Sequence, residues 1–185
     1  MEMLEKIMNN STRVICLILM LGVCSYSVFS QKQETMTVKV YFTDSNDNPN
    51  MEDCGKVKAV YRKAPKTKGV ARAALNELFK GPTKEENEAG LFSWFSKDSK
   101  HILKNINIKN GIAYVNLDIW VTENLGNATT SCGSASFFSE IETTLKQFPT
   151  VKKVFFAVEK NPSEFYEWMQ SECPEELKNC DNSNF

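Results

Sequence analysis

The segment Ala64–Leu91 constrains the fold most, because it contains an amphipathic helix, its stop signal and a polar turn in one stretch. Apolar side chains recur there at helical spacing and form one stripe: Val70, Ala71, Ala74, Leu75, Leu78 and Phe79. We take Thr67 as the N-cap of a helix that begins at about Lys68. Gly81 supplies the left-handed position after the last turn, and Pro82 prevents a further turn. The segment therefore predicts a helix that ends sharply and buries one face.

The rest of the chain alternates between strand and helix patterns. Strands are predicted at Thr37–Thr43, Val57–Tyr61 and Val151–Val158, a hairpin at His101–Asp118, and helices from about Ser134 and from Pro162. This order predicts an α/β chain of the α+β type, in which two main helices pack on a small mixed β-sheet of about four to six strands and a short helix follows near the C-terminus. Without residues 1–30, the chain is long enough for one domain and hardly for two.

The hairpin turns at Asn110-Gly111, the dipeptide best suited to a two-residue type I′ turn. In that register one face of the hairpin carries only apolar side chains, namely Ile106, Ile108, Ala113, Val115 and Leu117. The opposite face carries polar side chains, namely Asn105, Asn107, Asn116 and Asp118. We therefore expect one face to be core and the other to be solvated.

The N-terminus is typical of an export leader. Basic residues precede the uncharged apolar run Val14–Val23, which has the length of a signal-peptide core, and Ser30 is a small residue at a cleavage position. Cys24 also lies in the outline of a bacterial lipoprotein box and is the candidate for lipidation. An uncleaved leader would instead anchor the chain in the membrane, although it is slightly short of the ~20 residues that span a bilayer. All three interpretations of residues 1–30 place residues 31–185 outside the cytoplasm.

Export makes disulfide bonds the expected state of the cysteines, because disulfides persist outside the cytoplasm. The mature chain keeps an even number of cysteines, namely Cys54, Cys132, Cys173 and Cys180. Four cysteines can form two disulfides in three ways, and the sequence leaves all three open. Cys173 and Cys180 follow a predicted helix at short spacing and could staple the tail. A metal site is disfavoured because the chain has no Cys-x-x-Cys and a single histidine, His101.

Motifs for catalysis and for cofactors are missing from the sequence. His101 has no serine or cysteine nucleophile motif near it, and Gly126 and Gly133 bracket no phosphate-binding pattern. We therefore expect no enzyme activity, no cofactor and no metal. The net charge of −1 gives no general attraction to nucleic acid or to an acidic membrane, so we expect membrane contact only through a retained leader. Phe92 and Trp94 belong to an aromatic cluster that we assign to core closure.

The distribution of charge along the chain indicates more about function than the motifs do. Lys56–Arg72, here called the basic segment, holds seven basic residues and no acidic one, whereas Glu159–Asp181 holds seven acids against two lysines. The residues that we assign to a partner-binding surface are Lys56, Lys58, Arg62, Lys63 and Lys66. A solvated strand and helix edge explains the basic segment most simply. The sharper hypothesis is head-to-tail self-association or docking to an anionic envelope protein, since complementary charges steer encounter.

Three segments carry a family resemblance: ARAALNELFKGPT from Ala71, NGIAYVNLD from Asn110 and TLKQFPTVKKVFF from Thr144. They resemble the GerMN domain of bacterial sporulation and spore germination proteins, over roughly Val38–Lys160. The resemblance implies helices stacked on a mixed sheet within residues 31–161. Residues 162–185, where we expect a short helix and an acidic tail, lie outside it, as does the loop Trp120–Gly133.

The resemblance also implies the disulfide Cys54–Cys132, because the contexts MEDC and SCGS look like loop positions in exported GerMN proteins. The short spacing of Cys173 and Cys180 leads us to expect the second disulfide, Cys173–Cys180.

The resemblance implies a function as well. GerMN proteins are linked to sporulation, germination and assembly of envelope complexes, so we expect a non-catalytic, extracytoplasmic binding or scaffolding module that contacts an envelope protein or itself. The alternative is a peptidoglycan- or glycan-binding accessory, or a cell-wall-directed hydrolase. Its distinguishing feature would be paired acids in an aromatic-lined groove, and the sequence shows no such groove.

Overall fold

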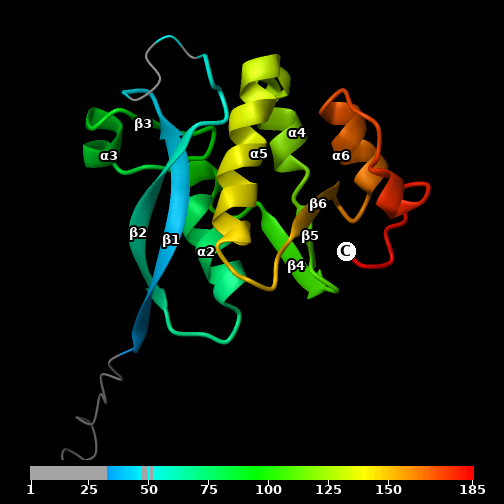
Figure 1. Ribbon diagram of the computed structural model, residues 1–185, viewed down its shortest axis with the longest axis horizontal. Coiled ribbons are helices and arrows are strands. Elements are labelled where there is room, and N and C mark those ends of the chain that lie inside the picture. The colour runs from blue at the N-terminus through cyan, green and yellow to red at the C-terminus, as the bar shows by residue number, and fades with distance from the viewer. Residues whose placement is uncertain (1–32, 47–49, 51) are drawn as a thin grey trace, which may run out of the picture. The chain divides into compact units, whose positions relative to one another are not determined.

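The computed structural model describes residues 33–46, 50 and 52–185. The leader predicted for residues 1–30, with Cys24, lies outside the described residues. Residues 34–185 form a compact unit. Its strands and helices, shown in Figure 1, are β1 (Thr35–Asp44), β2 (Val57–Pro65), α2 (Val70–Leu78), α3 (Lys84–Glu88), β3 (Leu91–Phe92), β4 (Leu103–Lys109), β5 (Ile112–Leu117), α4 (Trp120–Asn124), α5 (Ser131–Lys146), β6 (Lys153–Val158) and α6 (Pro162–Trp168).

Within the described residues, the strands form two three-stranded sheets. Sheet A is antiparallel, with the order β2-β1-β3. Sheet B has the order β4-β5-β6, and β6 runs parallel to β5. The predicted α+β class is therefore confirmed, although the strands are divided between two sheets where one was expected. Figure 1 shows α5 between the two sheets, where it contacts β1 and β6.

Helix α5 divides the sheets because it lies along the edge of β1 and replaces a neighbouring strand. Alternate residues of β1 need hydrogen-bond partners on that side, and one polar row of α5 supplies them. The bonds run from Gln147 Nε2 to the Lys39 carbonyl (2.8 Å), from the Tyr41 N–H to Thr144 Oγ1 (3.1 Å) and from the Thr43 N–H to Glu140 Oε1 (3.2 Å). The row satisfies these strand groups, so β1 needs a second strand only at its end, where β3 pairs with Thr43 and Asp44.

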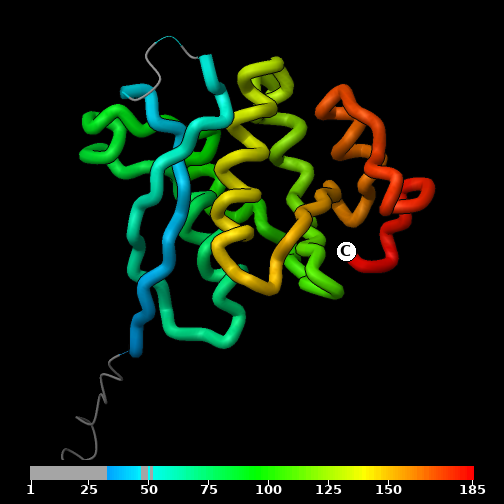
Figure 2. Tube along the Cα trace, in the orientation of Figure 1, coloured from blue at the N-terminus to red at the C-terminus, as the bar shows by residue number. Residues whose placement is uncertain are grey.

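The β4–β5 hairpin turns where predicted, with φ of 53° at Asn110 and 82° at Gly111. Its faces, however, differ from the prediction. Ile108 of the expected core face is 38% exposed, and the polar face is solvated on β4, where Asn107 is exposed, but not on β5. Asn116 is 2% exposed and accepts a hydrogen bond from the Lys160 N–H (2.7 Å), and the Tyr114 ring packs 5.4 Å from the Phe185 ring. The C-terminal segment, red in Figure 2, folds back onto this face. Both faces of β5 are therefore buried, which alternation within the hairpin could not indicate.

Helix α2 forms where its stripe predicts, but its first turn differs. Gly69 is the N-cap, and Thr67 Oγ1 accepts from the Gly69 N–H (3.1 Å) in a turn that precedes the helix. The prediction of Thr67 as N-cap is therefore wrong. Gly81 is left-handed as expected, with φ of 71°, and a Cβ there would overlap the carbonyl of Phe95.

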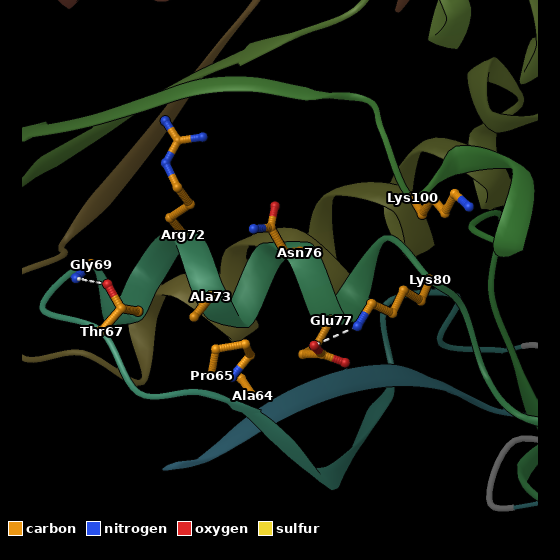
Figure 3. A pocket seen from close by; sticks show the side chains of 10 residues that line it. All are labelled: Ala64, Pro65, Thr67, Gly69, Arg72, Ala73, Asn76, Glu77, Lys80 and Lys100. Carbon is orange, nitrogen blue, oxygen red and sulfur yellow. Dashed lines mark hydrogen bonds and ion pairs between the residues drawn. The ribbon is translucent and has the colours of Figure 1, made fainter. Parts of the chain in front are cut away.

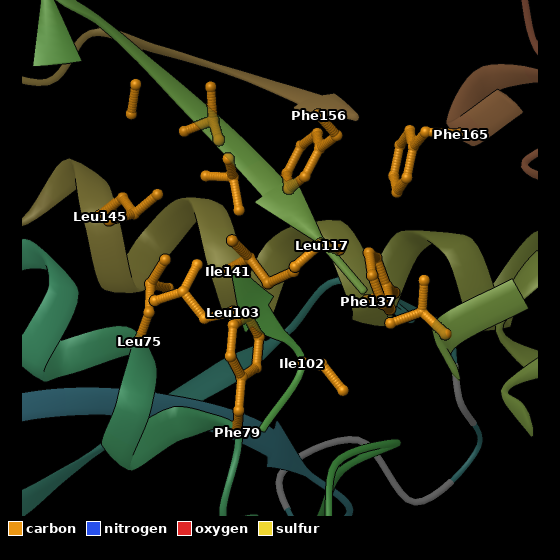
Figure 4. Close-up of a cluster of buried hydrophobic side chains, with 14 of the residues drawn as sticks. Leu75, Phe79, Ile102, Leu103, Leu117, Phe137, Ile141, Leu145, Phe156 and Phe165 are labelled. Atoms are coloured by element: carbon orange, nitrogen blue, oxygen red, sulfur yellow. The ribbon is translucent and has the colours of Figure 1, made fainter. Parts of the chain in front are cut away.

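One continuous core joins the helices to both sheets. Figure 4 shows Phe137, Ile141 and Leu145 of α5 directed at this core, as the predicted helical spacing requires. Phe165 of α6 stacks on Phe156 of β6 at a ring distance of 4.9 Å. The short C-terminal helix is therefore part of the core rather than a loose appendage.

We predict that Gly81→Ala lowers the free energy of unfolding by roughly 1 to 3 kcal/mol, because alanine is strained at positive φ and its methyl would overlap backbone. Urea denaturation would measure the change. Gly126→Ala is the matched control, since a Cβ at Gly126 meets nothing within 4 Å. Equal midpoints for the two variants would contradict the prediction.

Candidate functional site

The basic segment does not form a single surface, because side chains alternate along β2. Lys58 and Arg62 lie opposite Phe42 and Val38, so they share the core-facing side of sheet A. Lys63 lies opposite Thr37 and points to the other side. The strand period therefore separates cations that are adjacent in the sequence.

Arg62 is a structural residue rather than a surface cation. Its guanidinium forms an ion pair with Glu86 of α3, donates to the Gly81 carbonyl (3.2 Å) and lies 5.6 Å from the centre of the Phe42 ring. Only 16% of its side chain is exposed. Arg62 therefore holds α3 and the turn after α2 against sheet A.

The lysines of the basic segment differ in their partners. Lys58 pairs with Asp44 (3.4 Å), and Lys66 pairs with Glu34 (2.7 Å), while both lysine side chains stay more than half exposed. Lys56 is half-buried just before β2. Lys63 is exposed and makes no ion pair with any residue that the structure describes.

A cationic and aromatic surface remains on the side of sheet A that faces away from α2. We call it the outer face, and it consists of Lys39, Tyr41, Tyr61 and Lys63. Tyr61 is 70% exposed, more than any other large apolar side chain in the described part of the chain. On the opposite side, Val38 and Ala64 pack against Ala73 and Ala74 of α2. Only one side of sheet A therefore belongs to the core.

An apolar pocket of about 430 Å³ lies at the end of sheet A, beside the N-terminus of α5. Its lining residues come from the C-terminal end of β1, the segment before β2, the end of β3 and the residues after it, and the N-terminal end of α5: Thr43, Ser45, Cys54, Phe92, Trp94, Thr130, Cys132, Gly133 and Ser136. The disulfide Cys54–Cys132 forms one wall, with its Cα atoms 5.1 Å apart. Phe92 and Trp94 meet edge to face at 5.1 Å, and the Trp94 indole N–H donates to Ser136 Oγ (2.8 Å).

Phe92 and Trp94 were expected to close the core, and Phe92 does not. Phe95 is 1% exposed and Trp94 is half-buried against the core, whereas Phe92 is 40% exposed. The strand β3 causes the difference, because its two residues alternate and direct Leu91 inward and Phe92 outward.

Glu140 is a buried acid whose burial was not predicted from the sequence. Its side chain is fully buried, Oε1 accepts from the Thr43 N–H and from Thr43 Oγ1 (2.8 Å), and Oε2 lies 2.5 Å from Ser93 Oγ. Burial raises the pKa of the Glu140 carboxyl to about 8, against hydrogen bonds that favour the charged form. Its position in the sequence could have indicated burial, because Glu140 directly precedes Ile141 within the apolar stripe of α5.

A second pocket, of about 510 Å³, lies along the flank of α2 (Figure 3). Three of its four charged side chains already have partners within the chain. Lys80 pairs with Glu77 (2.6 Å), and Arg72 donates to Asn105 Oδ1 (2.8 Å). Lys100 is the fourth, and it is exposed. The Arg72 contact fastens α2 to β4, and one exposed lysine leaves little chemistry for a ligand.

No metal site was expected, in part because the chain has a single histidine. That residue, His101, is exposed and lies 5.7 Å from the Trp120 ring. In residues 33–46, 50 and 52–185, no cluster of three or more histidine, cysteine, aspartate or glutamate side chains could hold a metal ion. No helix among these residues has the length and apolarity needed to cross a membrane.

The fold and the surface define a small, disulfide-bonded α+β domain with a cationic outer strand. The chain belongs to the Germane family, described as sporulation and spore germination, which it matches over residues 39–164. The resemblance to GerMN domains is thereby confirmed.

Two solved structures from one protein are similar to this chain. The tandem GerMN domains of the sporulation protein GerM from Bacillus subtilis share 23% identity with it, at a TM-score of 0.44, over 72% of this chain and 42% of that chain. The first GerMN domain of GerM shares 22% identity, at a TM-score of 0.43, over 66% of this chain and 82% of that chain. The chain thus spans less than half of the tandem structure. No curated protein matches it.

We predict that stability falls between pH 5 and pH 8 because of Glu140. The unfolded chain loses this proton near pH 4.5 and the folded chain near pH 8, so the folded state binds more protons between these values and rising pH favours unfolding. The slope from this group is at most about 1.4 kcal/mol per pH unit. Glu140→Gln keeps an acceptor for Thr43 and a donor for Ser93, and it should make the free energy of unfolding depend less on pH.

Urea midpoints across this pH range would measure the effect. Glu142→Gln, on the same helix but partly exposed and paired with Lys146, is the matched control. If Glu140→Gln and Glu142→Gln both followed the wild-type pH profile, a neutral Glu140 would be ruled out.

Proposed function

We propose that this protein is a non-catalytic binding module that acts outside the cytoplasm and holds protein partners in a sporulation or germination assembly. Membership of the Germane family supports the biological process. The cationic outer strand of sheet A supports binding, and is the observation that carries the proposal.

The extracytoplasmic location is supported by the disulfides. Cys54 bonds to Cys132, and Cys173 bonds to Cys180 with Cα atoms 5.8 Å apart. Such bonds form and persist in oxidising compartments and are rare in the cytosol. The first of these pairs is also the one that the resemblance to exported GerMN proteins implies.

Protein contact fits the chemistry of the outer face. Tyrosine is enriched at interfaces because it offers a large apolar ring with a polar tip. Tyr61 lies beside Lys63 on the outer face. Lys58 lies on the other side of the same strand and Lys66 just beyond its end, each with more than half of its side chain exposed. These lysines would steer a protein of opposite charge towards the exposed ring.

A cross-linked pull-down of the tagged full-length protein from its own envelope fraction would test the proposal. We expect a defined protein partner, or a second copy of this chain, to be lost when Lys58, Lys63 and Lys66 are changed to glutamine. Neutralisation is preferred to charge reversal, because a glutamate at position 58 would repel Asp44. Arg62 stays unchanged, since it is structural.

The matched control changes Lys97, Lys100 and Lys152 to glutamine, since these lysines are also exposed but lie outside the basic segment. The proposal predicts that the control captures the partner as the wild type does. If no protein is recovered with any form, or if both variants lose it equally, the proposed surface is wrong.

A glycan-binding accessory is the second candidate, because the pocket beside α5 presents Phe92 and Trp94. Aromatic faces stack on the apolar faces of sugar rings. The neighbouring hydroxyls are largely used within the chain, since Ser136 Oγ and Thr130 Oγ1 already bond to Trp94 and to the Gly133 N–H. A hydrolase would need a second carboxylate beside Glu140, and the hydrogen-bond partners of Glu140 are Thr43 and Ser93.

If this second candidate holds, Phe92→Ala should reduce sedimentation of the protein with purified cell-wall fragments by roughly fivefold or more, since stacking on one ring is worth about 1 kcal/mol. Ile108→Ala is the matched control, because Ile108 is similarly exposed on another strand. Equal binding of both variants would exclude the pocket as a glycan site.

A further inference from the structure

Among the residues that the structure describes, no strand pairs with the outer edge of β2, so sheet A ends there. Strand β2 is the outer strand of the order β2-β1-β3, and its nine residues pair with β1 without a shift in register. Ala59, Tyr61 and Lys63 are exposed along this strand. A long, regular and exposed edge is a ready template for another strand.

The hydrogen bonds of β1 show which backbone groups of β2 are unpaired. Odd-numbered residues of β1 bond to α5, as Tyr41 does, and the Asp44 N–H donates to the Lys56 carbonyl (3.3 Å). Even-numbered residues of β1 therefore face β2, where they pair with even-numbered residues such as Val60. The odd-numbered residues of β2 must turn their backbone groups outward: Val57, Ala59, Tyr61, Lys63 and Pro65, of which all but Pro65 have an N–H.

Charge decides which strand this edge accepts. Lysines on an edge strand oppose pairing with identical strands, and a second copy of β2 would bring the same cations alongside Lys63 and Lys66. An acidic strand would instead neutralise them. On the core-facing side, Asp44 and Glu86 already neutralise Lys58 and Arg62. Only the outer face therefore favours acids in the incoming strand.

We propose that the edge of β2 binds an extended acidic segment of a partner protein by antiparallel strand addition, with acidic side chains beside Tyr61 and Lys63 and uncharged side chains on the core-facing side. This inference rests on the proposed function and names the mode and chemistry of the contact. Backbone hydrogen bonds provide affinity in this mode, and side chains of alternate residues provide selection.

The geometry fixes which residues of the added strand carry the contact. In an antiparallel pair, residues directly opposite each other that exchange hydrogen bonds also share a face. The partner residues opposite Ala59, Tyr61 and Lys63 therefore supply both the backbone bonds and the acidic side chains. Their neighbours turn backbone groups away from β2.

A nine-residue peptide of alternating glutamate and threonine, matched to the length of β2, provides the test. Three forms are compared: the plain peptide, one N-methylated at the glutamates and one N-methylated at the threonines. N-methylation removes a donor and restricts both methylated peptides similarly, so each controls the other. The dissociation constant and amide hydrogen exchange of the full chain are measured by NMR.

We expect the plain peptide to slow exchange at Ala59, Tyr61 and Lys63, but not at Val60, whose N–H already bonds to β1. Methylation at the glutamates should weaken binding by roughly tenfold or more, since several backbone hydrogen bonds are lost. Methylation at the threonines should have little effect. A lysine–threonine peptide should not bind at the same concentration.

Equal effects of the two methylations, protection outside the odd-numbered residues of β2, or no binding of the plain peptide would overturn strand addition. The reverse methylation pattern would assign parallel pairing and overturn the antiparallel arrangement. A second variant, Tyr61→Pro, removes one outward N–H without removing a bond to β1, and it should weaken the plain peptide as glutamate methylation does. Charge-dependent capture of a partner in the pull-down, with no effect of methylation, would leave the proposed function standing and reject this inference alone.

Discussion

The structure depends on the row of polar side chains by which α5 closes the edge of β1. Glu140, Thr144 and Gln147 satisfy three backbone groups that would otherwise face an apolar core or another strand. Unpaired backbone groups are costly when buried, so this row fixes the position of α5 against sheet A. It also explains why sheet A stops at a two-residue β3 on that side, and why its only long free edge in the described residues is β2.

The row places an acid inside the protein, where burial favours its neutral form. A charged carboxylate at Glu140 would lose its hydration and face no cation, because its neighbours are the hydroxyls and amide of Thr43 and Ser93. A protonated carboxyl can accept from Thr43 and donate to Ser93, and so fulfils both contacts. Burial therefore favours the neutral form, and the core-facing stripe of α5 carries a group whose charge depends on pH.

Hydrophobic periodicity predicted those elements whose buried face is encoded by residues close together in the sequence. The stripe of α2, the stripe of α5 and the Asn110-Gly111 turn each encode their structure within a few residues, and the three segments that resemble GerMN domains correctly indicated the family. Contacts between distant segments were not predictable in this way. Lys160, just after β6, is the hydrogen-bond partner of the buried Asn116, and Thr43 of β1 is a partner of the buried Glu140, in each case more than 40 residues away. The basic segment is different, because the strand period of β2 separates its cations and was already readable from the sequence.

The bridge between Cys54 and Cys132 has a mechanical consequence. It joins the chain just before β2 to the first turn of α5, whose polar row already holds β1. Tension applied to β2 from its Val57 end would therefore reach α5 through a covalent bond, rather than peeling hydrogen bonds from β1 one at a time. The strand can detach progressively only from its Pro65 end, so the domain resists pulling in one direction more than in the other.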